Sequence, residues 1–292
     1  MSAHAVEAAE AVSTPLSLLE KAAKALSAFQ GSRPRLTLTE VVQRSGLPRS
    51  SAHRILDQLV QLGWLEREGR DYRLGMRMLE LGALASHHNR LRRAALPHLH
   101  ALHEATGHLV HLTVLDGAEV VYLERIGRSD DSGVPSRVGG RQPAYCTAAG
   151  KAILAFSDAA LVDEVVGQGL RPRTPRTLTR PEFFRSELRR ARERGVAFDY
   201  EEAYRGVFCV AAPVRGSGRA IAAVSVGGNG LHRELERIAP AVVGCTRKVW
   251  QSMFGPGRPA ARGRADEEWA EPAVPRESMD DMMAWLRSSD WM

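Results

Sequence analysis

Apolar and polar positions follow a helical period over residues 19–29 and again over residues 50–62, and the second of these stretches has two unlike faces. Its apolar residues recur at intervals of three and four and form one stripe that must pack on a neighbour: Ala52, Ile55, Leu59 and Leu62. The opposite stripe is polar: Ser50, His53, Arg54, Asp57 and Gln61. Hydroxyl, imidazole, guanidinium and amide groups are those that contact phosphates and base edges in a DNA groove. The pattern therefore predicts a DNA-recognition helix.

The residues before this helix predict the rest of a helix-turn-helix. A support helix is expected over residues 19–29, and a second helix runs from a Thr39 cap to Ser45. Gly46 is free to take the left-handed conformation of a sharp turn. Pro48 stands where the recognition helix begins.

The residues after the helix predict a wing. Two strand-like runs flank a Glu-Gly-Arg-Asp turn, and Arg67 and Arg70 lie at its tip. Residues 31–78 contain nine arginines and five acidic residues, and this excess of positive charge suits the binding of a polyanion such as DNA. We therefore expect a winged helix-turn-helix domain over residues 15–75.

The chain beyond residue 75 predicts linker helices over residues 76–107 and then a change of period. The second linker helix is expected to start near Leu96, with Pro97 in its first turn, and to stop at Gly107. From His108 the period approaches two. A hairpin is expected around Asp116–Ala118, followed by a loop over 127–142 and by three strands between residues 196 and 226. Four helices are also expected. The first covers 147–156, the second runs from a cap at Ser157 to residue 166, the third runs from a capping box at 179–182 to Gly195, and the last covers 231–254. Helices on one antiparallel sheet make an α+β domain, here over residues 108–254.

The two ends of the chain lack this patterning. Residues 1–14 are rich in Ala and Glu and predict a mobile arm. Residues 255–292 are rich in Pro, Gly and charges and predict a disordered tail. Its apolar residues between Met279 and Trp291 could form one short helix, although a frayed tail is the favoured interpretation.

Composition narrows the class of protein without naming a function. With 44% hydrophobic and 25% charged residues and no long apolar run, the chain is expected to be a cytoplasmic protein with no membrane segment. Cys146, Cys209 and Cys245 are odd in number and widely spaced, so reduced thiols are expected rather than disulfides or a zinc site. We expect no cofactor.

The segments GLPRSSAHRILDQLVQLGWLE, RVGGRQPAYCTAAGKAILA, RGVAFDYEEAYRGVFCVAAPV and AIAAVSVGGNG resemble the IclR (isocitrate lyase regulator) family of bacterial transcription factors. The likeness covers about residues 15–254 in the expected order. It implies a winged helix-turn-helix, a linker helix and a GAF-like effector domain, with double-stranded operator DNA and a small-molecule effector as partners. It also implies a homodimer or tetramer.

The resemblance places the functional residues at two sites. Those at the DNA are Arg49, Ser50, Ser51, His53 and Arg54, to which the wing pattern adds Arg67 and Arg70. Those at the effector are Tyr145, Cys146, Thr147, Ala148, Ala149, Asp199, Val207, Cys209, Ser225 and Gly227. The family commonly has His at 145, Ala at 146 and Ser at 227. The departures here favour a bulkier or aromatic acid over the smallest polar acids.

Three other interpretations compete with an effector-responsive regulator. An enzyme is disfavoured because the chain has no GxSxG elbow, Walker loop or strand-linked GxGxxG, and we expect no catalytic residues. A metal sensor could use the histidines between His98 and His111, although surface histidines are commoner than ligands, and we expect no metal site. A thiol sensor could use Cys146, whose pKa a following helix N-terminus could lower, although a core or pocket-lining role is favoured for this residue.

Overall fold

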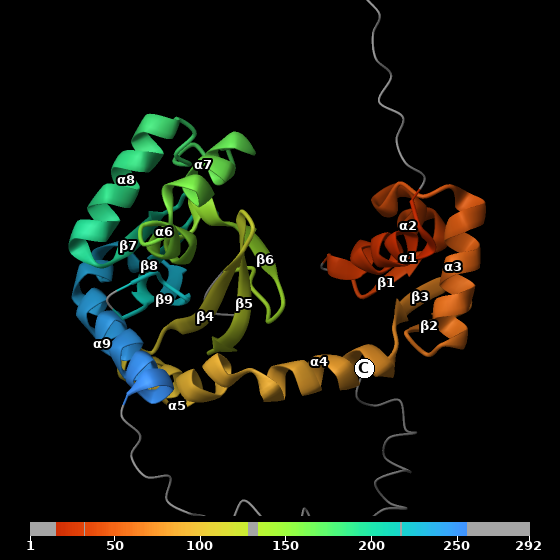
Figure 1. Cartoon of the computed structure of the whole chain (residues 1–292), viewed down its shortest axis with the longest axis horizontal. Helices are drawn as coiled ribbons and strands as arrows, with labels where there is room; N and C mark the ends of the chain where they lie inside the picture. The colour runs from red at the N-terminus through yellow and green to blue at the C-terminus, as the bar shows by residue number, and fades with distance from the viewer. Residues whose placement is uncertain (1–15, 32, 128–133, 217, 256–292) are drawn as a thin grey trace, which may run out of the picture. The chain divides into compact units, whose positions relative to one another are not determined.

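The computed structural model describes residues 16–31, 33–127, 134–216 and 218–255. The expected N-terminal arm, and the expected tail apart from Gly255, lie outside these ranges. The described residues confirm the expected fold class, a winged helix followed by an α+β domain (Figure 1). No helix within these ranges is both long and apolar enough to cross a bilayer.

The N-terminal domain is a winged helix with a small antiparallel sheet in the order β1-β3-β2. Its elements are α1 (Leu18–Ser27), the 3-10 turn η1 (Ala28–Gln30), β1 (Arg35–Thr37), α2 (Leu38–Ser45), α3 (Arg49–Gln61), β2 (Leu65–Glu68) and β3 (Asp71–Leu74). The cap of α2 is Thr37, so the prediction of Thr39 was wrong. Glu40 lies three residues after Thr37, and the two side chains complete a capping box. Gly46 takes the left-handed conformation at φ 69°, as predicted.

The predicted apolar stripe of α3 packs into this domain except at its last position. Ala52, Ile55 and Leu59 are buried in one core with residues of α1, α2 and the sheet. Leu62 instead caps the helix and is 54% exposed, and Leu56 is buried where the stripe left a gap. The polar stripe is thereby turned away from the core.

Two helices follow, α4 (Met76–His88) and α5 (Arg90–Thr106). The start of α5 differs from the prediction, because the side chain of Asn89 accepts a hydrogen bond from the Arg92 N–H at 2.9 Å and caps the helix there. Pro97 therefore lies inside α5 and not in its first turn. No residue of α4 is buried.

The C-terminal domain is built on an antiparallel sheet in the order β6-β5-β4-β9-β8-β7. Its elements are β4 (Leu109–Asp116), β5 (Glu119–Ile126), β6 (Arg141–Pro143), the 3-10 turn η2 (Ala144–Cys146), α6 (Ala148–Leu154), α7 (Ala159–Gly167), α8 (Pro181–Arg194), β7 (Ala197–Tyr200), β8 (Val207–Val214), β9 (Ala222–Asn229), the 3-10 turn η3 (Leu231–Arg233) and α9 (Leu235–Phe254). Three local predictions were wrong. β6 lies within the expected loop, α7 is capped at Asp158 rather than Ser157, and no capping box opens α8.

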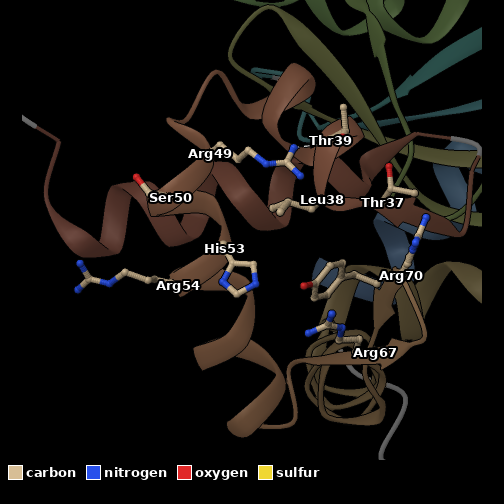
Figure 2. Close-up of a pocket in the computed structure, with 10 residues that line it drawn as sticks. Thr37, Leu38, Thr39, Arg49, Ser50, His53, Arg54, Arg67 and Arg70 are labelled. Carbon is tan, nitrogen blue, oxygen red and sulfur yellow. Dashed lines mark hydrogen bonds between the residues drawn. The ribbon is translucent and has the colours of Figure 1, made fainter.

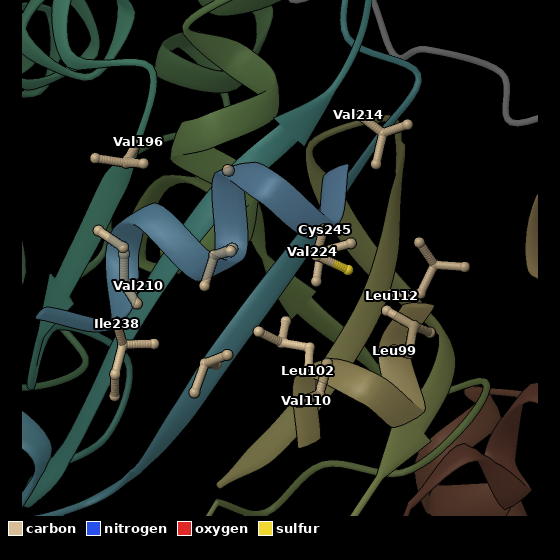
Figure 3. Close-up of a cluster of buried hydrophobic side chains, with 14 of the residues drawn as sticks. Leu99, Leu102, Val110, Leu112, Val196, Val210, Val214, Val224, Ile238 and Cys245 are labelled. Carbon is tan, nitrogen blue, oxygen red and sulfur yellow. The ribbon is translucent and has the colours of Figure 1, made fainter. Parts of the chain in front are cut away.

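The two faces of this sheet are covered differently. One face, here called the outer face, packs on α5 and α9 through an apolar core that includes Leu99, Val110, Val224 and Val242 (Figure 3). The other, here called the inner face, packs on α6, whose alanines meet alanines of β7, β8 and β9. Because successive strand residues point to opposite faces, every second residue of β4 and β9 belongs to the inner face.

Gly150 fixes how closely α6 approaches the segment before it. A β-carbon at this position would lie 2.1 Å from the carbonyl oxygen of Ala144, a distance that no side chain can satisfy. Glycine therefore allows η2 to fold tightly against α6 and holds residues 144–149 beside the inner face.

Candidate functional site

An open groove lies between α3 and the β2–β3 wing of the N-terminal domain (Figure 2). It is lined by Thr37, Leu38, Thr39, Arg49, Ser50, His53, Arg54, Arg67, Arg70 and Tyr72. Six of the seven residues predicted to contact DNA are among them. The seventh, Ser51, is half-buried on α3 and is not part of this lining.

The charged side chains of the groove are held differently. Asp57 on α3 pairs with His53 at 3.0 Å, and its other oxygen lies 3.7 Å from Arg67 of the wing. The guanidinium of Arg67 also lies over the ring of Tyr72. Arg54 makes no hydrogen bond, ion pair or ring contact with the described residues, and it extends away from α3 in Figure 2. The groove thus combines ordered cations with a free guanidinium, an arrangement that suits phosphates and base edges.

The second candidate site lies on the inner face of the large sheet. Asp199, Cys209 and Gly227 are paired across β7, β8 and β9 and form one row. Ser225 belongs to the next row, between Ala211 and His111. A β-carbon on Gly227 would lie 2.4 Å from the sulfur of Cys209, so this glycine keeps the row flat.

The other predicted effector residues lie beside these rows. Thr147 caps α6 by accepting a hydrogen bond from the Gly150 N–H, and Ala148 and Ala149 pack against the alanines of the sheet. Val207 is buried in a small cluster with Leu109 and Val134. The hydroxyl of Tyr145 donates a 2.6 Å hydrogen bond to the carbonyl of Arg171, so it is already satisfied by the protein.

Several inner-face residues were missed from the sequence. His111 of β4 is 2% exposed, its Nε2 lies 2.6 Å from the hydroxyl of Ser136, and its ring contacts that of Tyr122. Burial lowers the pKa of His111 to about 3, with a smaller contribution from Arg125, so the imidazole is neutral. The one signal in the sequence was a polar residue between apolar neighbours at an alternating position of β4.

A buried ion pair lies behind the row that contains Asp199. Lys151 of α6 is fully buried and pairs with Glu202, whose backbone N–H donates to Asp199 at 2.7 Å. Glu187 lies 4.0 Å from the same ammonium group. Burial raises the pKa of Asp199 to about 7, although Lys151 acts in the opposite direction. The group therefore titrates close to neutral pH.

The thiols do not have the environment that a redox sensor requires. Burial raises the pKa of Cys146 to about 12, which is opposite to the lowering by the following helix that a thiol sensor would need. Desolvation outweighs the effect of a short helix in which Thr147 already accepts from one of the free N–H groups, that of Gly150. Burial likewise raises the pKa of Cys209, and raises that of Cys245 to about 11.

The histidines of α5 are engaged separately. His98 bonds Ser252, and His103 bonds the carbonyl of His108. Within the part of the chain that the structure describes, no group of three or more His, Cys, Asp or Glu side chains is placed to hold a metal ion.

Comparisons with known families match both domains. The model of the IclR helix-turn-helix domain matches residues 18–69, and that of the bacterial transcriptional regulator IclR C-terminal domain matches residues 83–250. The chain is 35% identical over 212 residues to the HTH-type transcriptional regulator XynR of Escherichia coli, covering 71% of this chain and 84% of that protein. It is 34% identical over 253 residues to the glycerol operon regulatory protein of Streptomyces coelicolor, covering 82% and 97%.

Solved structures give the same result. An IclR homologue from Microbacterium hydrocarbonoxydans, complexed with 4-hydroxybenzoate, is 30% identical with a TM-score of 0.73, covering 81% of this chain and 99% of that chain. An IclR transcriptional regulator from Alicyclobacillus acidocaldarius is 26% identical with a TM-score of 0.73, covering 82% and 100%.

The raised pKa of Asp199 predicts a specific pH dependence of stability. The folded protein holds a proton that the unfolded chain, with a carboxyl pKa near 3.8, releases, so this contribution to stability is present below about pH 4 and is lost as pH rises to about 7. Asp199→Asn keeps the acceptor for the Glu202 N–H and removes the titration. In urea unfolding, the free energy of unfolding of the variant relative to that of the wild type should increase by roughly 2–3 kcal/mol between pH 4.5 and pH 8. The exposed Asp163→Asn is the control, and a pH-independent difference for Asp199→Asn would contradict the assignment.

Proposed function

The chain belongs to the IclR family of bacterial transcriptional regulators, as its sequence predicts, and on this premise we propose which surfaces bind the operator and the effector. It is a DNA-binding regulator whose C-terminal domain binds a small molecule. The operator lies in the groove between α3 and the wing, and the effector lies on the inner face of the large sheet. A target in genomic DNA places the protein in the cytoplasm.

The groove between α3 and the wing carries the DNA assignment. Four arginines and His53 converge there from two separate elements, with the hydroxyls of Thr37, Thr39 and Ser50 between them. Arg67 and Arg70 suit the phosphate backbone on the wing side, whereas His53 and the free Arg54 suit base edges. Ser51 contributes at the start of α3, where N–H groups face a phosphate.

Replacing Arg54 should weaken operator binding, because its guanidinium has no structural contact to lose among the described residues. With duplexes selected from a random pool by the wild type, Arg54→Ala should reduce affinity about tenfold or more, since one good bidentate contact to a base corresponds to about 1–3 kcal/mol. Fluorescence anisotropy across a salt series measures both affinity and slope. The exposed Arg189→Ala on α8 is the control. Unchanged affinity and salt slope for Arg54→Ala would remove α3 from the interface.

An apolar surface on the N-terminal domain supports a homodimer, from which a tetramer could be built. A groove there is lined by Leu18, Leu19, Ala22, Ala23, Leu26, Ile55, Gln58, Leu59, Leu62 and Trp64. Leu19 is 82% exposed, and Met76, Leu79, Leu81 and Leu84 of α4 are exposed as well. A second copy that covers these residues would also place two recognition helices on two operator half-sites.

Placing a charge in this surface should separate the copies. Leu19→Glu should shift the sedimentation of the full chain toward the monomer, because an ionised carboxylate cannot be buried without a partner. Phe183→Glu, at another exposed apolar position, is the control. A dimer of wild-type stability in Leu19→Glu would place the interface elsewhere.

The inner face carries the effector assignment. A small carboxylic or aromatic acid would lie against Ser225, Cys209 and Asp199, with residues 145–149 and Val207 at its border. The relative from Microbacterium binds 4-hydroxybenzoate, which supports this class of ligand. Because α5 packs on the outer face of β4 and β5, an effector that prefers one arrangement of these strands would bias the linker helices.

Filling the inner face should abolish the response to ligands. Acids from a panel of aliphatic and aromatic carboxylates that raise the melting temperature of the wild type should not raise that of Ser225→Trp, because the indole occupies the site. Ser225→Leu provides a smaller obstruction if the first variant folds poorly, and operator binding reports folding in both. A full thermal shift in both variants would mean that the effector binds elsewhere.

A further inference from the structure

Arg125 is a half-buried cation of the C-terminal domain that, unlike the fully buried Lys151, has no anionic partner among the described residues. It lies on β5 directly opposite His111, and therefore on the inner face. Its Nε donates to the hydroxyl of Ser136 at 3.3 Å and one terminal nitrogen donates to the carbonyl of Gly127 at 3.0 Å. Both acceptors are neutral. The other terminal nitrogen, Nη2, is buried and has no hydrogen-bond partner among the described residues.

Lys151 shows what a balanced cation looks like in the same domain. Its ammonium group pairs with Glu202 and has Glu187 nearby. A guanidinium whose terminal nitrogen is withdrawn from water costs free energy unless an anion or acceptor compensates it. No carboxylate within the described ranges pairs with Arg125, so the described residues leave its Nη2 open to an anionic partner.

The neighbours of Arg125 favour an anionic ligand. His111 is neutral and already bound to Ser136, so it adds no charge of its own and does not supply the missing acceptor. Two positions along β4, the hydroxyl of Thr113 is also buried and has no hydrogen-bond partner within the described ranges. Two strand residues span about 6.6 Å, and the ring of Tyr122 lies opposite Thr113. The inner face thus offers a cation at one end, an aromatic surface and a free hydroxyl.

We propose that Arg125 binds the carboxylate of the effector and selects a carboxylic acid over its neutral amide, while Thr113 accepts a hydrogen bond from a polar group on the far side of the ligand. This inference rests on the proposed effector site and specifies its chemistry. A carboxylate at Arg125 would take the unused N–H of Nη2 and form a charge-assisted hydrogen bond. Selection then follows from charge rather than from shape.

The test compares 4-hydroxybenzoate with 4-hydroxybenzamide, which have nearly the same shape and differ in charge. Calorimetry on the full-length wild type should show the acid binding at least tenfold more tightly than the amide. Arg125→Met should lose at least tenfold in affinity for the acid, with affinity for the amide within about twofold of the wild type. Arg185→Met, which removes a half-buried arginine from α8, should behave as the wild type.

Arg125→Lys is the second test variant, for use if Arg125→Met folds poorly. It keeps the charge but not the position of Nη2, so the acid should bind severalfold more weakly and the amide as before. Either variant binding the acid with wild-type affinity and preference would overturn the inference while leaving the proposed effector site intact. A wild type that binds its operator but neither probe would overturn both the inference and the proposed effector class. A wild type that binds no DNA would contradict the proposed function itself.

Discussion

Burial of both faces of one sheet is the constraint on which the C-terminal domain depends. The outer face meets it with branched apolar side chains from β4, β8 and β9 that interlock with α5 and α9. The inner face meets it with alanines that pack beneath α6 and with buried polar residues beside them, Asp199, His111 and Ser225. The close approach of α6 requires Gly150, and the flat row beneath requires Gly227. Small residues therefore determine where polar side chains can be concentrated.

The sequence predicts the fold well where local chemistry determines it. The helix-turn-helix follows from the period of α3 and from Gly46, and the wing and the β4–β5 hairpin follow from their turns. Predictions failed where two local signals competed. Thr37 and Thr39 are both plausible caps, and only Thr37 has Glu40 at the spacing of a capping box. Asn89 extends α5 back past Pro97, because its cap outweighs the preference of proline for a first turn.

The inner-face residues could not have been assembled from alternation alone. A bulge shifts the pairing between Leu112 and Thr113, so that Tyr122 and Arg125 both face inward although they are three positions apart. Simple period-two counting would place them on opposite faces. Similarly, Lys151 lies in an apolar helix, and the burial of its side chain depends on an ion pair with Glu202, a residue 51 positions away. Register and long-range ion pairing are tertiary properties that no short window of sequence contains.

The bulge in β5 also bears on how this architecture can accept changes in chain length. Leu123 is the extra residue, because Leu112 pairs with Glu124 and Thr113 pairs with Tyr122. Without Leu123 these two pairs would become successive rungs of a regular ladder, and Tyr122 and Arg125 would both still face inward. In evolutionary terms, a bulge at this point of the hairpin lets one residue be gained or lost while the ligand-facing side chains and the apolar core on the outer face are both kept.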